Sequence, residues 1–244
     1  MRLEKFSHGW FAFLAIFALF FGACGESSSE DSVNAPKTSE NFSESPEGSN
    51  SSSGSTFGTL TDIRDGQSYK TVSIGTQTWM AENLNYETTN SYCYDDNVAN
   101  CTKYGRLYTW AAAMDSVGTW STNGKGCGYN WTCSPTYPVR GVCPDGWRLP
   151  TVAELDAAVS KSTSGWNYGG NGTDAFGFSA LPAGLRDIGG NFGMEGDYAY
   201  FWSSTVVYGY ADFAYSVKLD YGRDYSRIET ERKDIGLSVR CLKN

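Results

Sequence analysis

The sequence predicts an α+β fold for most of the chain, on the basis of three observations. Two helix-like segments occur in the middle of the sequence, at residues 107–114 and just after Pro150. Short strand-like runs, separated by glycine, follow them and also precede them. Helices and strands that are segregated along a chain in this way indicate α+β rather than alternating α/β architecture. Six cysteines lie beyond residue 90, so we expect the domain to be stapled by disulfides.

The composition suits a folded domain and argues against several functional classes. Of the 244 residues, 40% are hydrophobic and 15% are aromatic, which is enough for a substantial core. The formal net charge of -8 argues against a protein that binds nucleic acid through the phosphate backbone. The single histidine, His8, lies in a segment that we expect to be removed. The mature chain would therefore have no histidine-based nucleophile system and no histidine-ligated zinc.

The N-terminus has the features of an export signal. Arg2 and Lys5 form a short basic start, and residues 10–21 are apolar without interruption. At about 1.5 Å per residue this run spans roughly 18 Å, well short of the ~30 Å hydrocarbon core of a bilayer. It therefore suits a cleaved signal peptide better than a membrane span. The run Phe21-Gly22-Ala23-Cys24 resembles the lipobox of bacterial lipoproteins, with Phe21 in place of the usual Leu.

This resemblance assigns residues 1–23 to a lipoprotein signal peptide and makes Cys24 the lipidated residue. The chain has seven cysteines, and the odd number is explained if one of them carries lipid. The alternative is ordinary cleavage that leaves Cys24 as a free thiol. Gly25, rather than Asp, follows Cys24, which by the same resemblance argues against retention at the inner membrane. We expect export and a location at the outer membrane or cell surface, with a lipid anchor as the only contact with membrane.

Residues 24–58 are predicted to be a disordered tether that carries the lipid at its start. Residues 25–58 contain 12 Ser, six acidic residues and one basic residue, with very few apolar ones. Such a segment cannot bury enough surface to offset its conformational entropy. As a flexible coil it spans on the order of 30 Å. The folded domain is expected to occupy residues 59–244.

The domain is predicted to open with short antiparallel strands. Asp65-Gly66 is a strong turn dipeptide. Residues 69–74 are rich in strand-forming side chains, and Gly75-Thr76 forms a turn into residues 77–80.

Two helices are predicted next. The first covers residues 107–114, which include three consecutive alanines. The second begins after Pro150, where Thr151 and Glu154 have the spacing of a capping box. Apolar residues then recur at helical spacing, at Val152, Leu155 and Val159.

The C-terminal part is predicted to return to short strands. They are Phe178–Leu181, Ala199–Thr205, Tyr215–Leu219 and Leu237–Cys241. The sequence shows no internal repeat at a fixed period.

Six cysteines allow fifteen pairings, and spacing alone favours one of them. Cys93–Cys101 and Cys127–Cys133 would close local loops, which leaves Cys143–Cys241 as a long-range bridge. The alternative is a cysteine-ligated metal site. The chain contains no C-x-x-C pair and has an export signal, both of which favour disulfides.

Six sequence blocks, in this order, resemble the Fibrobacter succinogenes major paralogous domain. They cover Trp79–Tyr86, Tyr104–Trp110, Cys143–Thr151, Gly177–Gly184, Phe201–Ser204 and Ser238–Cys241. The resemblance extends over nearly all of residues 59–244. It implies a C-type-lectin-like domain with two helices, a small curled antiparallel sheet, a long loop region and neighbouring termini. A bridge from the second helix region to the last strand agrees with that arrangement. The family implies no particular activity.

Lectins of this broad fold often hold sugar through calcium, but the required sequences are missing here. Neither Glu-Pro-Asn nor Gln-Pro-Asp occurs, and Phe201–Ser204 contains no carboxylate. Acidic oxygen donors cluster elsewhere, although neither cluster has the spacing of a known calcium loop. We interpret both clusters as solvated surface groups and expect no metal. They are Asp95, Asp96 and Asn97, and Asp187, Glu195 and Asp197.

Aromatic side chains offer another way to bind carbohydrate, because flat rings stack on sugar faces. We expect any ligand-binding surface between residues 206 and 224, a tyrosine-rich region. The candidate ligand-binding residues are Tyr208, Tyr210, Tyr215, Tyr221 and Tyr225. Trp120, Trp131 and Trp166 also lie in loop-like contexts, whereas Trp79, Trp110, Trp147 and Trp202 are expected in the core. The alternative for all these tyrosines is that they fill the core with their hydroxyls reaching water.

Together these features predict a non-catalytic binding module of the cell envelope, with polysaccharide as the expected ligand. The first alternative is a structural or interaction module that binds another envelope protein, and the second is an enzyme. No catalytic residue and no cofactor are identified, nucleic acid is not an expected partner, and the oligomeric state is left open.

Overall fold

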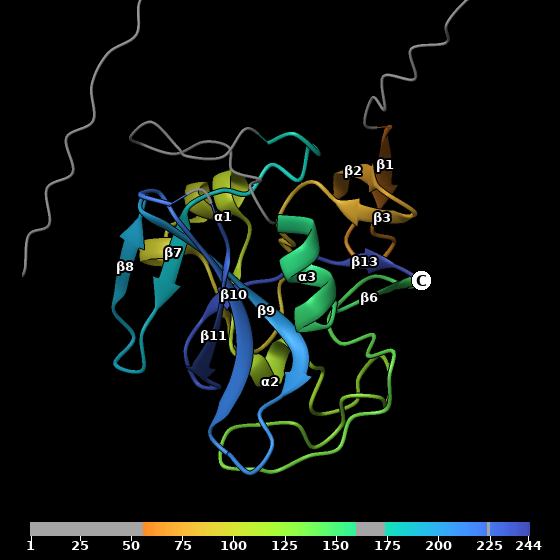
Figure 1. The fold of residues 1–244 in the computed structure, drawn as a ribbon. Coiled ribbons are helices and arrows are strands. Elements are labelled where there is room, and N and C mark those ends of the chain that lie inside the picture. Colours follow the sequence, from red (N-terminus) through yellow and green to blue (C-terminus); the bar gives the residue numbers. More distant parts are fainter. Residues whose placement is uncertain (1–55, 160–173, 224) are drawn as a thin grey trace, which may run out of the picture. The chain divides into compact units, whose positions relative to one another are not determined.

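The computed structural model describes residues 56–159, 174–223 and 225–244, which fold into two β-sheets and three short α-helices (Figure 1). The α+β class is therefore confirmed. Cys24, Trp166 and most of the expected tether lie outside the described residues. Among the described helices, none has the length and apolar character needed to cross a bilayer.

The first sheet joins the N-terminal strands to the end of the chain. Its order is β1 (Phe57–Thr61), β2 (Ser68–Ile74), β3 (Gln77–Met80), β13 (Leu242–Lys243) and β6 (Trp147–Arg148). Strand β1 begins two residues before the expected start of the domain at residue 59. The predicted strands at 69–74 and 77–80 are present, with the turn between them.

The second sheet carries the C-terminal strands. Its order is β11 (Arg227–Arg232), β10 (Phe213–Asp220), β9 (Tyr198–Val206), β12 (Leu237–Ser238), β5 (Leu107–Tyr108) and β4 (Ser91–Tyr92). Strand β7 (Ala183–Arg186) also pairs with β9, and β8 (Phe192–Glu195) pairs with β7. The expected small curled antiparallel sheet is right only in part, because the structure has two sheets and the second is mixed. Strands β12 and β7 both pair with β9 in parallel.

Strand β9 organises the interior because both of its faces are buried. Ala199 and Phe201 pack in one hydrophobic cluster with Leu155 of helix α3 (Val152–Val159). Tyr200 and Trp202, on the opposite face, pack in a second cluster with Trp110 and Ala113 of helix α2 (Trp110–Ala113). A strand covered on both sides needs continuous apolar character, which the run from Tyr198 to Trp202 has.

Helix α3 begins as the capping box predicts. The Thr151 amide donates to Glu154 Oε2 at 2.9 Å, and the Glu154 amide donates to Thr151 Oγ1 at 3.4 Å. Arg148 binds the same carboxylate through two nitrogens at 2.8 and 2.7 Å. These contacts lower the pKa of Glu154 to about 2, and the hydrogen bonds from Arg148 make the largest contribution.

The helix predictions need two corrections. The structure has a further helix, α1 (Val98–Tyr104), preceded by a 3₁₀ turn, η1 (Tyr94–Asp96). Helix α1 lacks an apolar stripe, but Asn97 caps its start and Gly105, with φ of 73°, ends it. The predicted helix at 107–114 is shorter: Leu107 and Tyr108 form β5, and α2 covers only Trp110–Ala113.

The strand predictions are also only partly right. Ala199–Thr205 and Tyr215–Leu219 lie within β9 and β10. Residues 178–181 form no strand. The carbonyls of Phe178 and Ser179 accept hydrogen bonds from the buried Arg240 side chain instead of from a neighbouring strand. The stretch Leu237–Cys241 divides: β12 belongs to the second sheet, and the chain then crosses to β13 in the first. Strands β8 and β11 were not predicted.

All three expected disulfides are present. Cys93–Cys101 ties η1 to α1, and Cys127–Cys133 closes a loop between α2 and β6. Cys143–Cys241 spans 98 positions, with a Cα–Cα distance of 5.9 Å. It links the segment before β6 to the segment between β12 and β13, where the chain passes from the second sheet to the first. The long bridge therefore ties the end of the chain to the middle of the domain.

Candidate binding groove

A groove lies where two loops meet at one end of the second sheet. One loop comes from the long connection between α2 and β6, and the other is the turn between β9 and β10; both lie at the bottom of Figure 1. The groove has a volume of about 590 Å³. Its described lining residues are Thr132, Cys133, Ser134, Pro135, Tyr137, Val206, Val207, Tyr208, Gly209, Tyr210 and Lys233.

Three contacts hold the two loops in place. The Lys233 ammonium donates to the carbonyl of Trp131 at 2.9 Å and to the carbonyl of Ala211 at 2.6 Å, so it links one loop to the other. The Tyr137 hydroxyl donates to the carbonyl of Ser204 on β9 at 3.1 Å. The Cys127–Cys133 disulfide constrains the first loop from within. The groove is therefore built on a braced scaffold.

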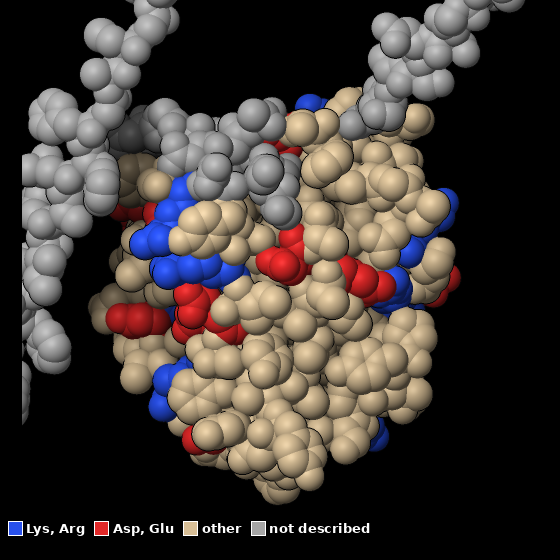
Figure 2. All heavy atoms as spheres, in the orientation of Figure 1, with Lys and Arg blue, Asp and Glu red and all other residues tan. Residues whose placement is uncertain are grey.

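Aromatic rings in the two loops that form this groove reach solvent. Tyr208 is 97% exposed and Tyr210 is 62% exposed, both on the β9–β10 turn. Trp131 and Tyr137, from the other loop, are 69% and 47% exposed. Figure 2 shows this end of the molecule as largely uncharged surface. Exposed aromatic rings that are gathered on a largely uncharged surface are typical of interaction sites, which makes this groove the candidate site.

The structure separates the five tyrosines that the sequence proposes as one site. Tyr208 and Tyr210 lie at one end of β10, whereas Tyr221 and Tyr225 lie beyond its other end, on either side of the turn into β11. Tyr215 is half-buried within β10. Because β10 has eight residues, its two ends are on the order of 25 Å apart. Only Tyr208 and Tyr210 line the groove, and residues 206–224 do not form one surface.

The tryptophans divide largely as the sequence predicts. Trp79, Trp110, Trp147 and Trp202 are buried in the core. Trp120 is half-buried and meets Tyr86 edge-on at 5.5 Å. Trp131 is exposed beside the groove. Sequence reasoning placed it in a loop but did not connect it to Tyr208 and Tyr210, because 77 residues separate Trp131 from Tyr208.

The acidic clusters serve local structure. Asp95 and Asp96 are exposed, and Asn97 accepts the Ala99 amide as a helix cap. Asp187 accepts the amide and side chain of Asn191, which lowers its pKa. Glu195 accepts the Tyr104 hydroxyl at 2.6 Å. Within the described ranges, no group of three or more His, Cys, Asp or Glu side chains is arranged to hold a metal ion.

Most of the sequence blocks that carry the family resemblance meet in the core, around a buried arginine. Arg240 is fully buried, and its guanidinium donates to Asn83 Oδ1 and to the carbonyls of Phe178 and Ser179. It also lies over the Phe178 ring, 4.3 Å from the centroid. Burial lowers the pKa of Arg240 to about 9, so the side chain stays charged at neutral pH.

Asn83 extends this buried network to a further block. Its Nδ2 donates to the carbonyl of Tyr104 at 2.8 Å and to Ser238 Oγ at 3.3 Å. Gly105 is required beside it, since a Cβ there would lie 2.7 Å from the Asn83 Cβ and the backbone has a positive φ. Four of the six blocks thus meet around Asn83 and Arg240. These four blocks therefore specify the packing of the core.

These features define a class: a disulfide-linked α+β domain with a largely uncharged, aromatic groove between two braced loops. The chain belongs to the family described as the Fibrobacter succinogenes major domain, whose model matches residues 72–165 and 158–243. No curated protein and no solved structure matches the chain. Family membership accounts for the core pattern, and the family description names no activity.

Proposed function

We propose that this chain is an exported lipoprotein whose domain binds polysaccharide, without catalysis, at the groove between the two loops. The observation that carries the proposal is the group of exposed rings from Tyr137, Tyr208 and Tyr210 that line a braced groove. Trp131, next in sequence to the lining residue Thr132, is exposed as well. Tyrosine and tryptophan present large, rigid surfaces at low entropy cost. The hydroxyls of Thr132 and Ser134 supply nearby hydrogen-bonding groups for a sugar.

A C-type-lectin-like architecture is part of this proposal. Strand β3 pairs with β13, so the start and the end of the domain share one sheet, as that fold requires. The long connection between α2 and β6, which supplies half of the groove, corresponds to its long loop region. In that architecture, loops carry ligands on a rigid scaffold.

A paired substitution tests the binding site. In the variant Tyr208→Ala with Tyr210→Ala, we expect retention on an immobilised polysaccharide panel to be lost, while Tm changes little because both rings are mostly exposed. The variant Tyr221→Ala with Tyr225→Ala removes the same ring type from the opposite end of β10 and serves as the control. Affinity electrophoresis measures retention. Equal retention by both variants would mean that the binding site lies elsewhere. A sharp fall in the Tm of the first variant would assign Tyr208 and Tyr210 to the core.

The lipid anchor at Cys24 is the second part of the proposal. The structure joins the other six cysteines in three bridges, so Cys24 is the odd one. A Cys24→Ser variant should lose acyl labelling and should no longer fractionate with the outer membrane. The control is Cys93→Ala with Cys101→Ala, which removes a bridge and should keep the label. Labelling that persists in the Cys24→Ser chain would refute the anchor.

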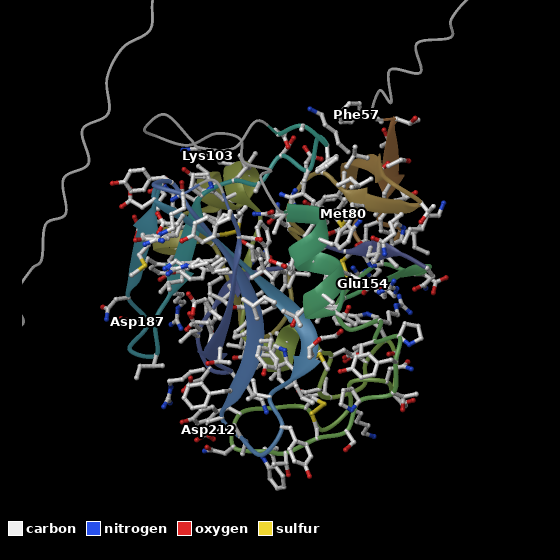
Figure 3. All side chains as sticks on the ribbon, in the orientation of Figure 1. Phe57, Met80, Lys103, Glu154, Asp187 and Asp212 are labelled. Carbon is white, nitrogen blue, oxygen red and sulfur yellow. A yellow bond between two sulfur atoms is a disulfide. The ribbon has the colours of Figure 1, made fainter. Side chains whose placement is uncertain are left out.

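Binding to an envelope protein is the second candidate function. Strand β1 lies at the edge of the first sheet, and Phe57 on it is 62% exposed (Figure 3). A free edge of this kind accepts an added strand from a partner. This candidate is favoured if the domain binds no glycan and a purified envelope protein protects β1 amides from hydrogen exchange.

A further inference from the structure

The binding groove contains one charge. Among its described lining residues, Lys233 is the only ionisable side chain apart from the tyrosines. It is 2% exposed, and its ammonium contacts two carbonyls and lies 4.7 Å from the centre of the Trp110 ring. Carbonyl dipoles and a ring face stabilise a cation without cancelling its charge.

No carboxylate neutralises Lys233 at close range. Among the ion pairs of the described residues, none includes Lys233. Asp212 acts on it electrostatically from further away, and its effect is smaller than that of burial, which lowers the pKa of the ammonium. A buried charge without a paired counter-ion is screened less than a surface charge. The described lining of the groove therefore holds one cationic side chain and no carboxylate, although the chain as a whole carries a net charge of -8.

We propose that the groove selects polysaccharides that carry uronate carboxylates on an otherwise largely neutral chain, with Lys233 as the specificity-determining residue. This proposal rests on the proposed function. The aromatic rings suit neutral sugar faces, and the single cation complements one carboxylate. A chain with dense charge, such as a sulfated glycan, would be repelled by the net charge of -8 and would find only one cation in the groove.

Matched polymers test the proposal on the unmodified protein. The probes are partially methyl-esterified polygalacturonate and the same polymer fully esterified, which differ in charge and share a backbone. We expect the partially esterified form to bind about tenfold more tightly at low salt, the order of a hydrogen bond to a charged group. The difference should shrink as sodium chloride rises. Equal affinity for both polymers would overturn the proposal, as would stronger binding of dextran sulfate than of either.

A substitution assigns the selectivity to one residue. In Lys233→Met, which keeps the apolar stem, we expect the preference for the charged polymer to fall to about onefold. Lys125→Met removes an exposed lysine outside the groove lining and is the control for net charge. The variant Tyr208→Ala with Tyr210→Ala should lower the affinity for both polymers by the same factor. Preference retained in a folded Lys233→Met chain would overturn the role of Lys233.

The outcomes separate this proposal from the function on which it rests. Binding of neutral glycans without preference for the charged polymer would refute uronate selection and leave polysaccharide binding standing. Absence of binding to every glycan would refute both. Because Lys233 also links the two loops, its variant can fail to fold. In that case the comparison of the two polymers on the unmodified protein decides the proposal alone.

Discussion

Arg240→Met is expected to lower the free energy of unfolding by about 3 kcal/mol or more. The substitution keeps an apolar stem but removes the guanidinium. Asn83 Oδ1 and the carbonyls of Phe178 and Ser179 then lose the hydrogen bonds that Arg240 donates to them. Each buried acceptor left without a partner costs about 1–3 kcal/mol, and the removal of a buried charge offsets part of that total. Urea denaturation at neutral pH measures the change.

A matched control and a second substitution make this prediction specific. Arg223→Met removes an arginine whose side chain is 46% exposed, and should change the free energy of unfolding far less than Arg240→Met does. The double variant Arg240→Met with Asn83→Leu removes the main donor and acceptor together. Its cost should be smaller than the sum of the two single substitutions. A loss of less than about 0.5 kcal/mol for Arg240→Met would show that the buried network contributes little.

Removal of the long disulfide is expected to have the largest effect of any single bridge. The loop closed by Cys143–Cys241 is much longer than that closed by Cys93–Cys101, with separations of 98 and 8 positions. In the chain-entropy model these bridges contribute roughly 4.7 and 2.5 kcal/mol. Cys143→Ala with Cys241→Ala should therefore unfold at markedly lower denaturant than Cys93→Ala with Cys101→Ala.

Peptide mapping without reductant accompanies this measurement. It should recover Cys143 joined to Cys241 and the other two bridges closed locally. A smaller loss for the long bridge than for the short one would contradict the entropic ranking. It would mean that residual structure in the unfolded chain already brings β6 and β13 together.

Elements with a local signal were predictable. The start of α3 follows from Thr151 and Glu154, whose side chains cap each other whatever the rest of the chain does. The short cysteine pairs follow from their spacing. Helix α1 was missed because it has no apolar stripe, although Asn97 and Gly105 mark its two ends.

The candidate site was predictable only in part. The sequence identified Tyr208 and Tyr210 as residues of a turn, and both are exposed at the groove. The sequence also groups them with Tyr221 and Tyr225, because these four residues are close along the chain. An intervening eight-residue strand separates the two pairs. Lys233 had no distinguishing signal, since a lysine is ordinarily exposed.

The sequence by itself determined the α+β class, the family and the pairing of six cysteines, because turn residues, capping residues and cysteine spacing act over short distances or in recognisable patterns. Only the tertiary structure decided which residues meet across long separations. Arg240 bonds the backbone at Phe178, which therefore needs no strand partner, and Lys233 joins the loops of Trp131 and Ala211. Burial makes these polar contacts obligatory, and burial is a property of the whole packed chain.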